Sequence, residues 1–487
     1  MNIHHAWSML LAWGCLLGDA AAQSLPTPTS AGQEMACMAP SAGNPCGDSG
    51  PATLSIDTGA EASVGNPIHL ASGNKYQQEV DLSPLPGELG LEVVRHYNSS
   101  QRHVLGLIGA GWRLSYETDL YPVGNGVQIV QADGSRLTFS PDAKAPGICQ
   151  GQQPAWGRVE IHQGRGGSTY TWHWTHGAAA GRRLHFNAQG RLVEIQSATG
   201  ATVVLRRGPR GELLSVTDPQ GRRMTLRYRR EPVASGPTFG GVMAIETPTG
   251  RLHYTHGPAP GHQAQGGEAQ VANLHRVHWP AQAGQADRVR EYHYEDPLHP
   301  QALTGISEQG DDGHGGFRSQ RVSTYRYNAA GLAVYSERQG QHVTLLQLQR
   351  ARPGREGMTL VQDERGRQSL YRHRWLAGEY RLTEAYGSGC AHCAPVNRRW
   401  TYDAAGRLIR TTLLQPVPVH NGQADARAEV QAVWTRQLDA QGRLLEIRLD
   451  GAREASTPPR HWWRLAYEDP RWPDKPTRIE RPSVVPG

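Results

Sequence analysis

Apolar and polar residues alternate along short stretches of this chain, and glycine-containing turns separate one stretch from the next. After Gly190, the residues Leu192 and Glu194 fall on one face of an extended segment. Val193 and Ile195 fall on the opposite face. Alternation with a period of two predicts β-strands, and Asn or Asp shortly before Gly predicts a tight turn between them. The pattern therefore predicts successive antiparallel β-hairpins from about residue 180 onward.

The turns recur at a fixed period. Gly211 follows Gly190 by 21 residues, and Gly221 follows Gly200 by the same interval. Three further stretches repeat the pattern: Tyr327 to Leu332, Tyr402 to Leu408 and Leu438 to Leu444. A single hairpin is marginally stable in water, so neighbouring units must pair edge to edge and bury one face together. The alternative is an ordinary β-sandwich, which seldom keeps a fixed sequence period.

Composition agrees with a turn-rich globular chain. The 487 residues include 57 Gly and 33 Pro, together about 18% against an average of about 12%. With 38% hydrophobic and 19% charged residues, the chain is not disordered throughout. The net charge of +6 is spread over scattered arginines and makes no basic footprint, so we expect no nucleic-acid partner.

The amino terminus predicts export. Trp7 to Leu17 form an apolar stretch of secretory length, and Ala20 to Ala22 supply the small residues of a cleavage site before Gln23. We expect a signal peptide over residues 1–22, a Pro/Gly/Ser-rich linker over residues 23–62 and a periplasmic, surface or secreted location. No other segment predicts a transmembrane span. A lipid anchor on Cys15 is the alternative.

Cleavage would leave five cysteines, an odd number, so at least one is unpaired. Cys37 and Cys46 lie in the linker, where an oxidising compartment favours a disulfide. Cys390 and Cys393 leave three interpretations open: a local disulfide or inert loop thiols, a metal site, and a redox pair.

Several stretches resemble the bacterial Rhs/YD-repeat family. Tyr402 to Leu408 is similar to the defining motif of that family. Three upstream stretches resemble, in order and spacing, the β-rich domain that precedes the repeats: Asn66 to Tyr76, Val94 to Ser99 and Gly109 to Tyr116. The resemblance covers about residues 63–487. It implies a β-rich domain over residues 63–170, followed by a repeat region over residues 171–487.

The resemblance also implies a fold and a role. In complete members a spiralling β-sheet winds into a hollow shell around a carboxy-terminal cargo, usually a toxin, which a core-associated segment cuts free. We recognise neither that segment nor a cargo domain here, and the repeat region holds only about fifteen units at the observed period. We therefore expect an all-β chain whose hairpin array forms a partial curved shell, truncated or split from further repeats.

The residues singled out by the sequence are mostly structural. The expected repeat-turn residues are Gly190, Gly211, Gly331, Tyr402, Asp403, Gly406 and Gly442. Trp172 and Trp174 alternate with His173 and so share one face of a strand. A buried core pair is the favoured interpretation, and a sugar-stacking platform is the alternative.

No constellation supports catalysis. Ser49 lies in a stretch that resembles a chymotrypsin-like nucleophile loop, but His392 follows it instead of preceding it. Asp311 and Asp312 lie at a Gly-rich hairpin tip that cannot hold a catalytic separation. A loop containing His253, His256 and His262 can catch a metal ion, but a solvated insertion is favoured.

We therefore expect no enzyme, cofactor or metal. The expected function is that of an exported structural or interaction protein that encloses or contacts a polypeptide cargo, a missing repeat segment or another envelope component. One alternative is a module that binds surface carbohydrate or cell wall through Trp172 and Trp174. A second alternative is a self-cleaving or metal-dependent enzyme.

Overall fold

The computed structural model describes residues 63–152, 156–175, 181–229, 238–261, 268–279, 287–311, 317–377, 379–388, 397–425, 427–450, 461–469 and 476–482. These ranges all belong to one compact unit, Met35–Gly487. The expected signal peptide and linker, and the cysteines Cys37, Cys46, Cys390 and Cys393, lie outside the described residues. Within the described ranges the chain contains strands and short 3-10 helices but no α-helix, which confirms the all-β prediction.

One antiparallel sheet of 28 strands, here called the wall, makes up most of the described chain. Each strand pairs with the wall strands before and after it in the sequence, as successive hairpins require. In the described ranges no pairing joins the last strand back to the first, so the sheet is open and is consistent with a partial shell. The prediction of a hairpin array is confirmed.

The wall strands are β8 (Asp119–Val123), β9 (Gly126–Val130), β10 (Arg136–Pro141), β11 (Ile148–Gly151), β12 (Arg158–His162), β13 (Thr169–His173), β14 (Arg183–Phe186), β15 (Leu192–Gln196), β16 (Thr202–Arg207), β17 (Leu213–Thr217), β18 (Arg223–Tyr228), β19 (Val242–Thr247), β20 (Gly250–Gly257), β21 (Asn273–Trp279), β22 (Arg288–His293), β23 (Gly305–Asp311), β24 (Phe317–Tyr327), β25 (Ala333–Arg338), β26 (Gln341–Gln349), β27 (Gly357–Asp363), β28 (Gln368–Leu376), β29 (Glu379–Gly387), β30 (Arg398–Tyr402), β31 (Leu408–Leu414), β34 (Val430–Leu438), β35 (Leu444–Asp450), β36 (His461–Ala466) and β37 (Arg478–Glu480).

The segment before the wall forms a separate three-stranded sheet, here called the inner sheet. Its strands are β3 (Tyr76–Leu82), β4 (Val93–Asn98) and β7 (Trp112–Leu114). Short pairs accompany the two sheets: β1 (Ser63–Val64) with β2 (Ile68–His69), β5 (Leu105–Gly106) with β6 (Gly109–Ala110), and β32 (Val419–His420) with β33 (Gln423–Ala424). The short 3-10 helices are η2 (Ser99–Gln101) and η5 (Glu268–Val271).

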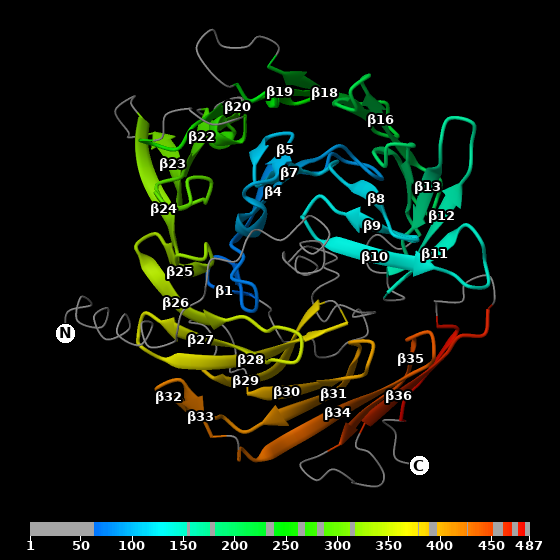
Figure 1. Ribbon diagram of the computed structural model, residues 1–487, viewed down its shortest axis with the longest axis vertical. Helices are drawn as coiled ribbons and strands as arrows, with labels where there is room; N and C mark the ends of the chain where they lie inside the picture. The colour runs from blue at the N-terminus through cyan, green and yellow to red at the C-terminus, as the bar shows by residue number, and fades with distance from the viewer. Residues whose placement is uncertain are drawn as a thin grey trace. The chain divides into compact units, whose positions relative to one another are not determined.

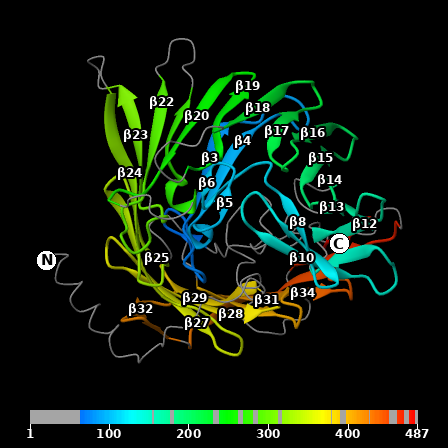
Figure 2. The same ribbon diagram turned by 45° about the horizontal axis from the view of Figure 1, so that its top comes forward.

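The wall curves around the inner sheet. Arg222, in the turn before β18, donates to the carbonyl oxygen of Pro86 at 2.8 Å. Thr359, on β27, donates to the carbonyl oxygen of Leu70 at 2.5 Å. The segment between residues 70 and 86 thus contacts wall strands that lie far apart in the sheet. Figures 1 and 2 show the green and yellow wall strands following one another around the blue inner strands.

The main apolar core lies between the inner sheet and the wall. Val93, Tyr97 and Trp112 of the inner sheet are fully buried in a cluster that also contains wall residues from Leu120 to Tyr325. A second cluster packs β1, β2 and their neighbours against strands β25 to β30. Because the wall and its contents bury each other, the inner sheet serves as the core of the wall that surrounds it.

The turn that follows Tyr402 and Asp403, here called the YD turn, has the tight geometry that its Asp and Gly predict. Asp403 Oδ1 accepts hydrogen bonds from the backbone N–H of Ala405 at 3.0 Å and of Arg407 at 2.9 Å. Gly406 has a φ of +74°, a conformation that a Cβ disfavours. The structure adds one element, because Arg407 Nε donates to Asp403 Oδ2 at 2.6 Å. The aspartate is therefore held by both backbone and guanidinium.

The same turn recurs along the wall. An Asp bonded to the Arg four residues later is found at Asp218, Asp363 and Asp439. Asn187 and Asn328 accept the two backbone N–H groups in the same way. The predicted turn glycines Gly190, Gly211, Gly331 and Gly442 all have positive φ, between +70° and +86°. Each of these four glycines lies in a turn between two consecutive wall strands.

The tyrosine of the motif anchors the turn to the preceding strand. Tyr402 donates its hydroxyl to the carbonyl oxygen of Leu382 at 2.7 Å, and Tyr327 donates to Leu303 at 2.7 Å. A register shift between Thr401 and Tyr402 accompanies the contact. Equivalent bonds are made by Tyr228 and Tyr467. The hydroxyl thus ties the end of its own strand to the backbone of the preceding hairpin arm.

The wall does not begin at the expected domain boundary. Its first strand, β8, starts at Asp119, and the pairing passes through residue 170 without a break, from β12 to β13 to β14. The structural change falls near residue 118, where the inner segment ends.

Removing the tyrosine hydroxyl tests this anchor. In Tyr327→Phe the carbonyl of Leu303 loses its donor, and we expect a loss of about 1 kcal/mol in the free energy of unfolding, measured by urea denaturation. Tyr121→Phe is the matched control because the Tyr121 side chain is exposed. Equal denaturation midpoints for Tyr327→Phe and the unmodified protein would contradict the anchoring role.

Candidate functional site

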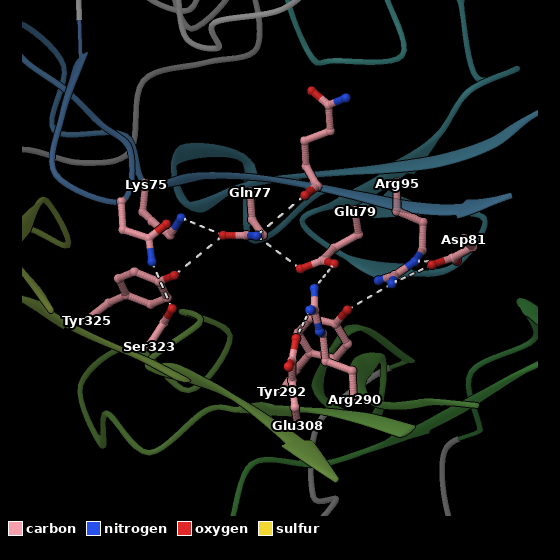
Figure 3. Close-up of polar contacts among 12 residues, drawn as sticks. Lys75, Gln77, Glu79, Asp81, Arg95, Arg290, Tyr292, Glu308, Ser323 and Tyr325 are labelled. Carbon is pink, nitrogen blue, oxygen red and sulfur yellow. Dashed lines mark hydrogen bonds and ion pairs between the residues drawn. The ribbon is translucent and has the colours of Figure 1, made fainter. Parts of the chain in front are cut away.

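A row of polar side chains joins the inner sheet to the wall, and we call it the seam. Alternate residues of an extended segment point to the same face. Gln77, Glu79 and Asp81 of β3, together with Lys75 directly before it, therefore project toward the wall. Figure 3 shows Gln77 meeting Tyr325 of β24 and Glu79 meeting Arg290 of β22. Asp81 is bound to Arg95, which in turn meets Tyr292 of β22, and Glu308 of β23 joins through Arg290.

The centre of the seam is a buried ion pair. Arg95 of β4 donates to Asp81 through Nε at 2.6 Å and through Nη2 at 2.9 Å, and both side chains are 0% exposed. Burial alone would lower the pKa of Arg95, but the Asp81 carboxylate and Tyr292 outweigh it, so this pKa lies well above its ordinary value. Arg95 therefore stays charged inside the protein.

The wall closes around this pair with aromatic side chains. Tyr292 accepts a hydrogen bond from Arg95 Nη2 at 2.8 Å, and Tyr254 of β20 donates to Asp81 Oδ2 at 2.8 Å. The guanidinium also lies over the Trp112 ring, 5.0 Å from its centroid. Burial, followed by the Asp81 charge, raises the pKa of Tyr254 well above its ordinary value, so its hydroxyl remains a donor.

A second group of charges lies beside the first. Arg290 forms ion pairs with Glu79 of the inner sheet and with Glu308 of the neighbouring wall strand. Glu79 is almost fully buried and also accepts a hydrogen bond from Gln77 Nε2 at 2.9 Å. One guanidinium thus bridges a carboxylate of the inner sheet and a carboxylate of the wall.

Lys75 lies at one end of the seam. Its side chain is fully buried, and its Nζ donates to Gln77 Oε1 at 2.9 Å and to the carbonyl oxygen of Tyr76. The same nitrogen lies 4.3 Å from the centroid of the Tyr325 ring. Burial lowers the pKa of Lys75 well below its ordinary range, and the Glu79 charge opposes this only in part.

The arrangement positions the inner sheet in one register. A buried ion pair adds little net stability over apolar packing, but separating its partners is strongly destabilising. Any other placement of β3 against β22 to β24 would separate Asp81 from its aromatic partners and Glu79 from Arg290. The seam therefore specifies how the inner sheet sits against the wall.

Two of the predicted turn glycines also contact the segment before the wall's repeats. The carbonyl oxygen of Gly190 accepts a hydrogen bond from the backbone N–H of Leu120 at 2.8 Å. A Cβ on Gly331 would lie 2.5 Å from Nη2 of Arg102, which follows η2. These glycines permit close approach in addition to making turns, and the turn residues themselves lie outside the seam.

The tryptophan pair does not form a binding platform. Trp172 is 0% exposed, and its indole N–H donates to the carbonyl oxygen of Trp156 at 2.6 Å. Trp174 stacks on Trp172 with ring centroids 4.5 Å apart. The expected glycan platform needs an exposed Trp172 face, and in the structure that ring belongs to the core between sheet and wall.

The remaining candidates are scattered. His253 and His256 lie on β20, His262 and Asp312 lie outside the described residues, and Cys149 is a buried, unpaired cysteine on β11. Sequence reasoning missed the seam, although its signal is present: residues 75–81 place polar and charged side chains at every second position. It also missed the arginines that follow the turn glycines.

Comparison with known proteins gives limited matches. A family model described as a domain of unknown function (DUF6531) matches residues 65–139, which include the inner sheet and the first wall strands. No curated protein matches the chain. No helix in the described ranges has the length and apolar character needed to cross a bilayer.

Among solved structures, the crystal structure of TcdB2-TccC3-TEV matches with 10% identity and a TM-score of 0.27, over 80% of this chain and 22% of that chain. The Tc holotoxin pore of Photorhabdus luminescens matches with 12% identity and a TM-score of 0.25, over 77% and 21%. A porin-like protein from Bacteroides uniformis matches with 12% identity and a TM-score of 0.19, over 55% and 91%. The chain spans about a fifth of the first two structures.

The buried ion pair can be tested by removing one charge. Asp81→Asn leaves Arg95 buried without its counter-charge, and we expect a loss of about 3 to 5 kcal/mol in the free energy of unfolding, measured by urea denaturation. The double variant Asp81→Leu/Arg95→Met removes both charges and should recover much of this loss.

The matched control for this experiment is Glu246→Gln. Glu246 pairs with Arg227 at 2.7 Å on the exposed surface, so its loss should leave the midpoint nearly unchanged. Similar midpoints for Asp81→Asn and Glu246→Gln would show that the seam does not hold the inner sheet.

Buried histidines make the fold sensitive to acid. Burial lowers the pKa of His69 to about 3 and those of His96, His256 and His373 to about 4. Histidine in an unfolded chain titrates near pH 6.5, so below that pH the unfolded chain binds more protons than the folded one. Stability should therefore fall as the pH drops from 6.5 toward 4.

We expect the urea midpoint of the unmodified protein to fall between pH 7 and pH 5, and to fall less in His256→Gln. The glutamine amide can still donate to the Ile108 carbonyl that His256 now contacts at 3.0 Å, but it does not titrate. Each such histidine can lower the free energy of unfolding by up to about 1.4 kcal/mol for each pH unit below 6.5. His420→Gln, at an exposed position, is the control. If the urea midpoint changed equally with pH in His256→Gln and His420→Gln, buried His256 would not be a source of the acid sensitivity.

Proposed function

We propose that this chain is an exported structural or interaction protein of the Rhs/YD-repeat type, whose wall encloses or contacts another polypeptide or an envelope component. The observation that carries the proposal is the continuous wall of hairpins curved around an inner sheet of the same chain. The turn motif of Tyr402, Asp403 and Gly406, which resembles that of the family, recurs along this wall.

The inner sheet illustrates how such a wall holds a polypeptide. It is bound through side chains of the wall's concave side, with apolar residues forming the core and the seam fixing the register. Binding of this kind requires complementary surfaces and no chemical step. We therefore propose that the protein acts without making or breaking covalent bonds.

Protease protection of a fused segment tests enclosure. A flexible Gly/Ser segment with a single protease site is attached after residue 487, and in a second fusion protein, which lacks residues 1–22, the same segment is attached before residue 23. If the wall encloses its carboxy-terminal continuation, cleavage of the first fusion should be at least about tenfold slower, and denaturant should equalise the two rates.

Two results would contradict the proposal. Equal cleavage rates under native conditions would exclude enclosure of the fused segment. The intact mass before protease is added should match the full fusion, and a defined fragment at that stage would show that the chain cleaves itself.

A further inference from the structure

A polar row crosses the outer face of strands β12 to β15, opposite the face that packs into the core. Tyr170, Trp172 and Leu184 point into the core, so the residues between them point outward. Thr171 lies directly opposite Glu160 on β12 and His185 on β14. Figure 2 shows these four strands side by side in the cyan-green part of the wall.

Two imidazole rings converge on one oxygen in this row. His162 Nε2 lies 3.1 Å from Thr171 Oγ1, and His185 Nδ1 lies 3.1 Å from the same atom. The two nitrogens are therefore at most about 6 Å apart. Thr171 is buried beneath the rings, whereas His162 is exposed and the His185 side chain is 33% exposed. Solvent thus reaches the space between the rings from outside.

One arrangement of protons satisfies all three contacts of the two rings. His185 Nε2 faces the Glu194 carboxylate at 3.9 Å, which favours a proton on Nε2 and leaves the Nδ1 lone pair directed at Thr171. The threonine hydroxyl then donates to His185 Nδ1, and its oxygen accepts from His162 Nε2. A carboxylate behind a histidine is the arrangement that orients imidazole ligands in metal sites.

We propose that a divalent transition-metal ion binds here, between His162 Nε2 and His185 Nδ1. Imidazole suits Cu²⁺, Ni²⁺ and Zn²⁺, and affinity should be highest for Cu²⁺. Metal–nitrogen bonds of about 2.1 Å require the two nitrogens to approach to about 4 Å or less, so both rings must rotate toward each other when the ion binds. To bind the ion, His162 must move its proton from Nε2 to Nδ1 and give up its hydrogen bond to Thr171.

The site is an exchangeable one. In the described part of the chain no group of three or more His, Cys, Asp and Glu side chains is placed to hold a metal ion, so two imidazoles bind and water completes the coordination. Glu160 adds negative charge next to Thr171, although Arg158 and His173 each engage it at 3.1 Å. The ion would link β12 to β14 across β13 and so stabilise this part of the wall.

This site differs from the metal-binding alternative that the sequence suggested. That alternative relied on His253, His256 and His262, whereas the two ligands proposed here lie on regular strands in a fixed register. The proposal also departs from the expectation that no metal is bound, and it does not depend on the proposed function of the wall.

Copper titration of the full mature chain, without an affinity tag, tests the proposal. We expect one Cu²⁺ to bind more tightly than the background from the other histidines, with an electron paramagnetic resonance spectrum that shows two equatorial imidazole nitrogens. His162→Gln and His185→Gln should each weaken this site at least about tenfold and reduce the coupling to one nitrogen.

Three further measurements sharpen the test. His293→Gln is the matched control, because His293 lies on the same sheet and contacts the Ser307 hydroxyl at 2.8 Å, and it should leave the tight site unchanged. Glu194→Gln should weaken binding about tenfold while keeping two nitrogens, since Glu194 acts only by positioning His185. Copper should raise the thermal midpoint of the unmodified protein and not that of His185→Gln.

Unchanged affinity and nitrogen count in both histidine variants would overturn the proposal. The same conclusion would follow if the unmodified chain bound no Cu²⁺ more tightly than the double variant His162→Gln/His185→Gln. Thermal midpoints without metal show whether each variant is folded, so a loss of binding can be separated from a loss of structure.

Discussion

The turn at which an aspartate bonds its own backbone is the constraint on which the rest of the structure depends. In the Asp403 turn, one carboxylate accepts two backbone N–H groups and a guanidinium, while Gly406 takes positive φ. The turn fixes the hairpin register, and a register slip of one residue would reverse the faces of every side chain in the strand. Repeated along the wall, this local choice keeps one face apolar.

The apolar face of the wall must be buried against another structural element. The inner sheet supplies that cover, and the seam between Asp81, Arg95 and the tyrosines of β20 and β22 fixes its placement. The wall is therefore not an isolated sheet in the described part of the chain. It is built around an element that precedes it in the sequence.

Local features of the fold could be predicted from the sequence, and long-range features could not. The turns at Gly190 and Gly406 follow from Asn or Asp before Gly, because that chemistry lies within a few residues. The tyrosine anchor joins Tyr327 to Leu303, and the seam joins residues about 200 positions apart, so neither leaves a periodic signal. The wall starts at Asp119, ahead of the expected repeat region, because β8 to β13 continue the same ladder although they carry the repeat spelling only in degenerate form around Gly134.

The separation between the seam partners also has a consequence for biosynthesis. Arg95 is translated 197 residues before Tyr292, and at typical synthesis rates this interval lasts about 10 to 40 s. During that time β3 and β4 lack β22 to β24, the wall strands that complete the seam. The alternating charges of β3 discourage a waiting strand of this kind from joining the edges of other nascent chains. Charges that later fix the inner sheet against the wall thus also disfavour edge-to-edge pairing of β3 while β22 is still missing.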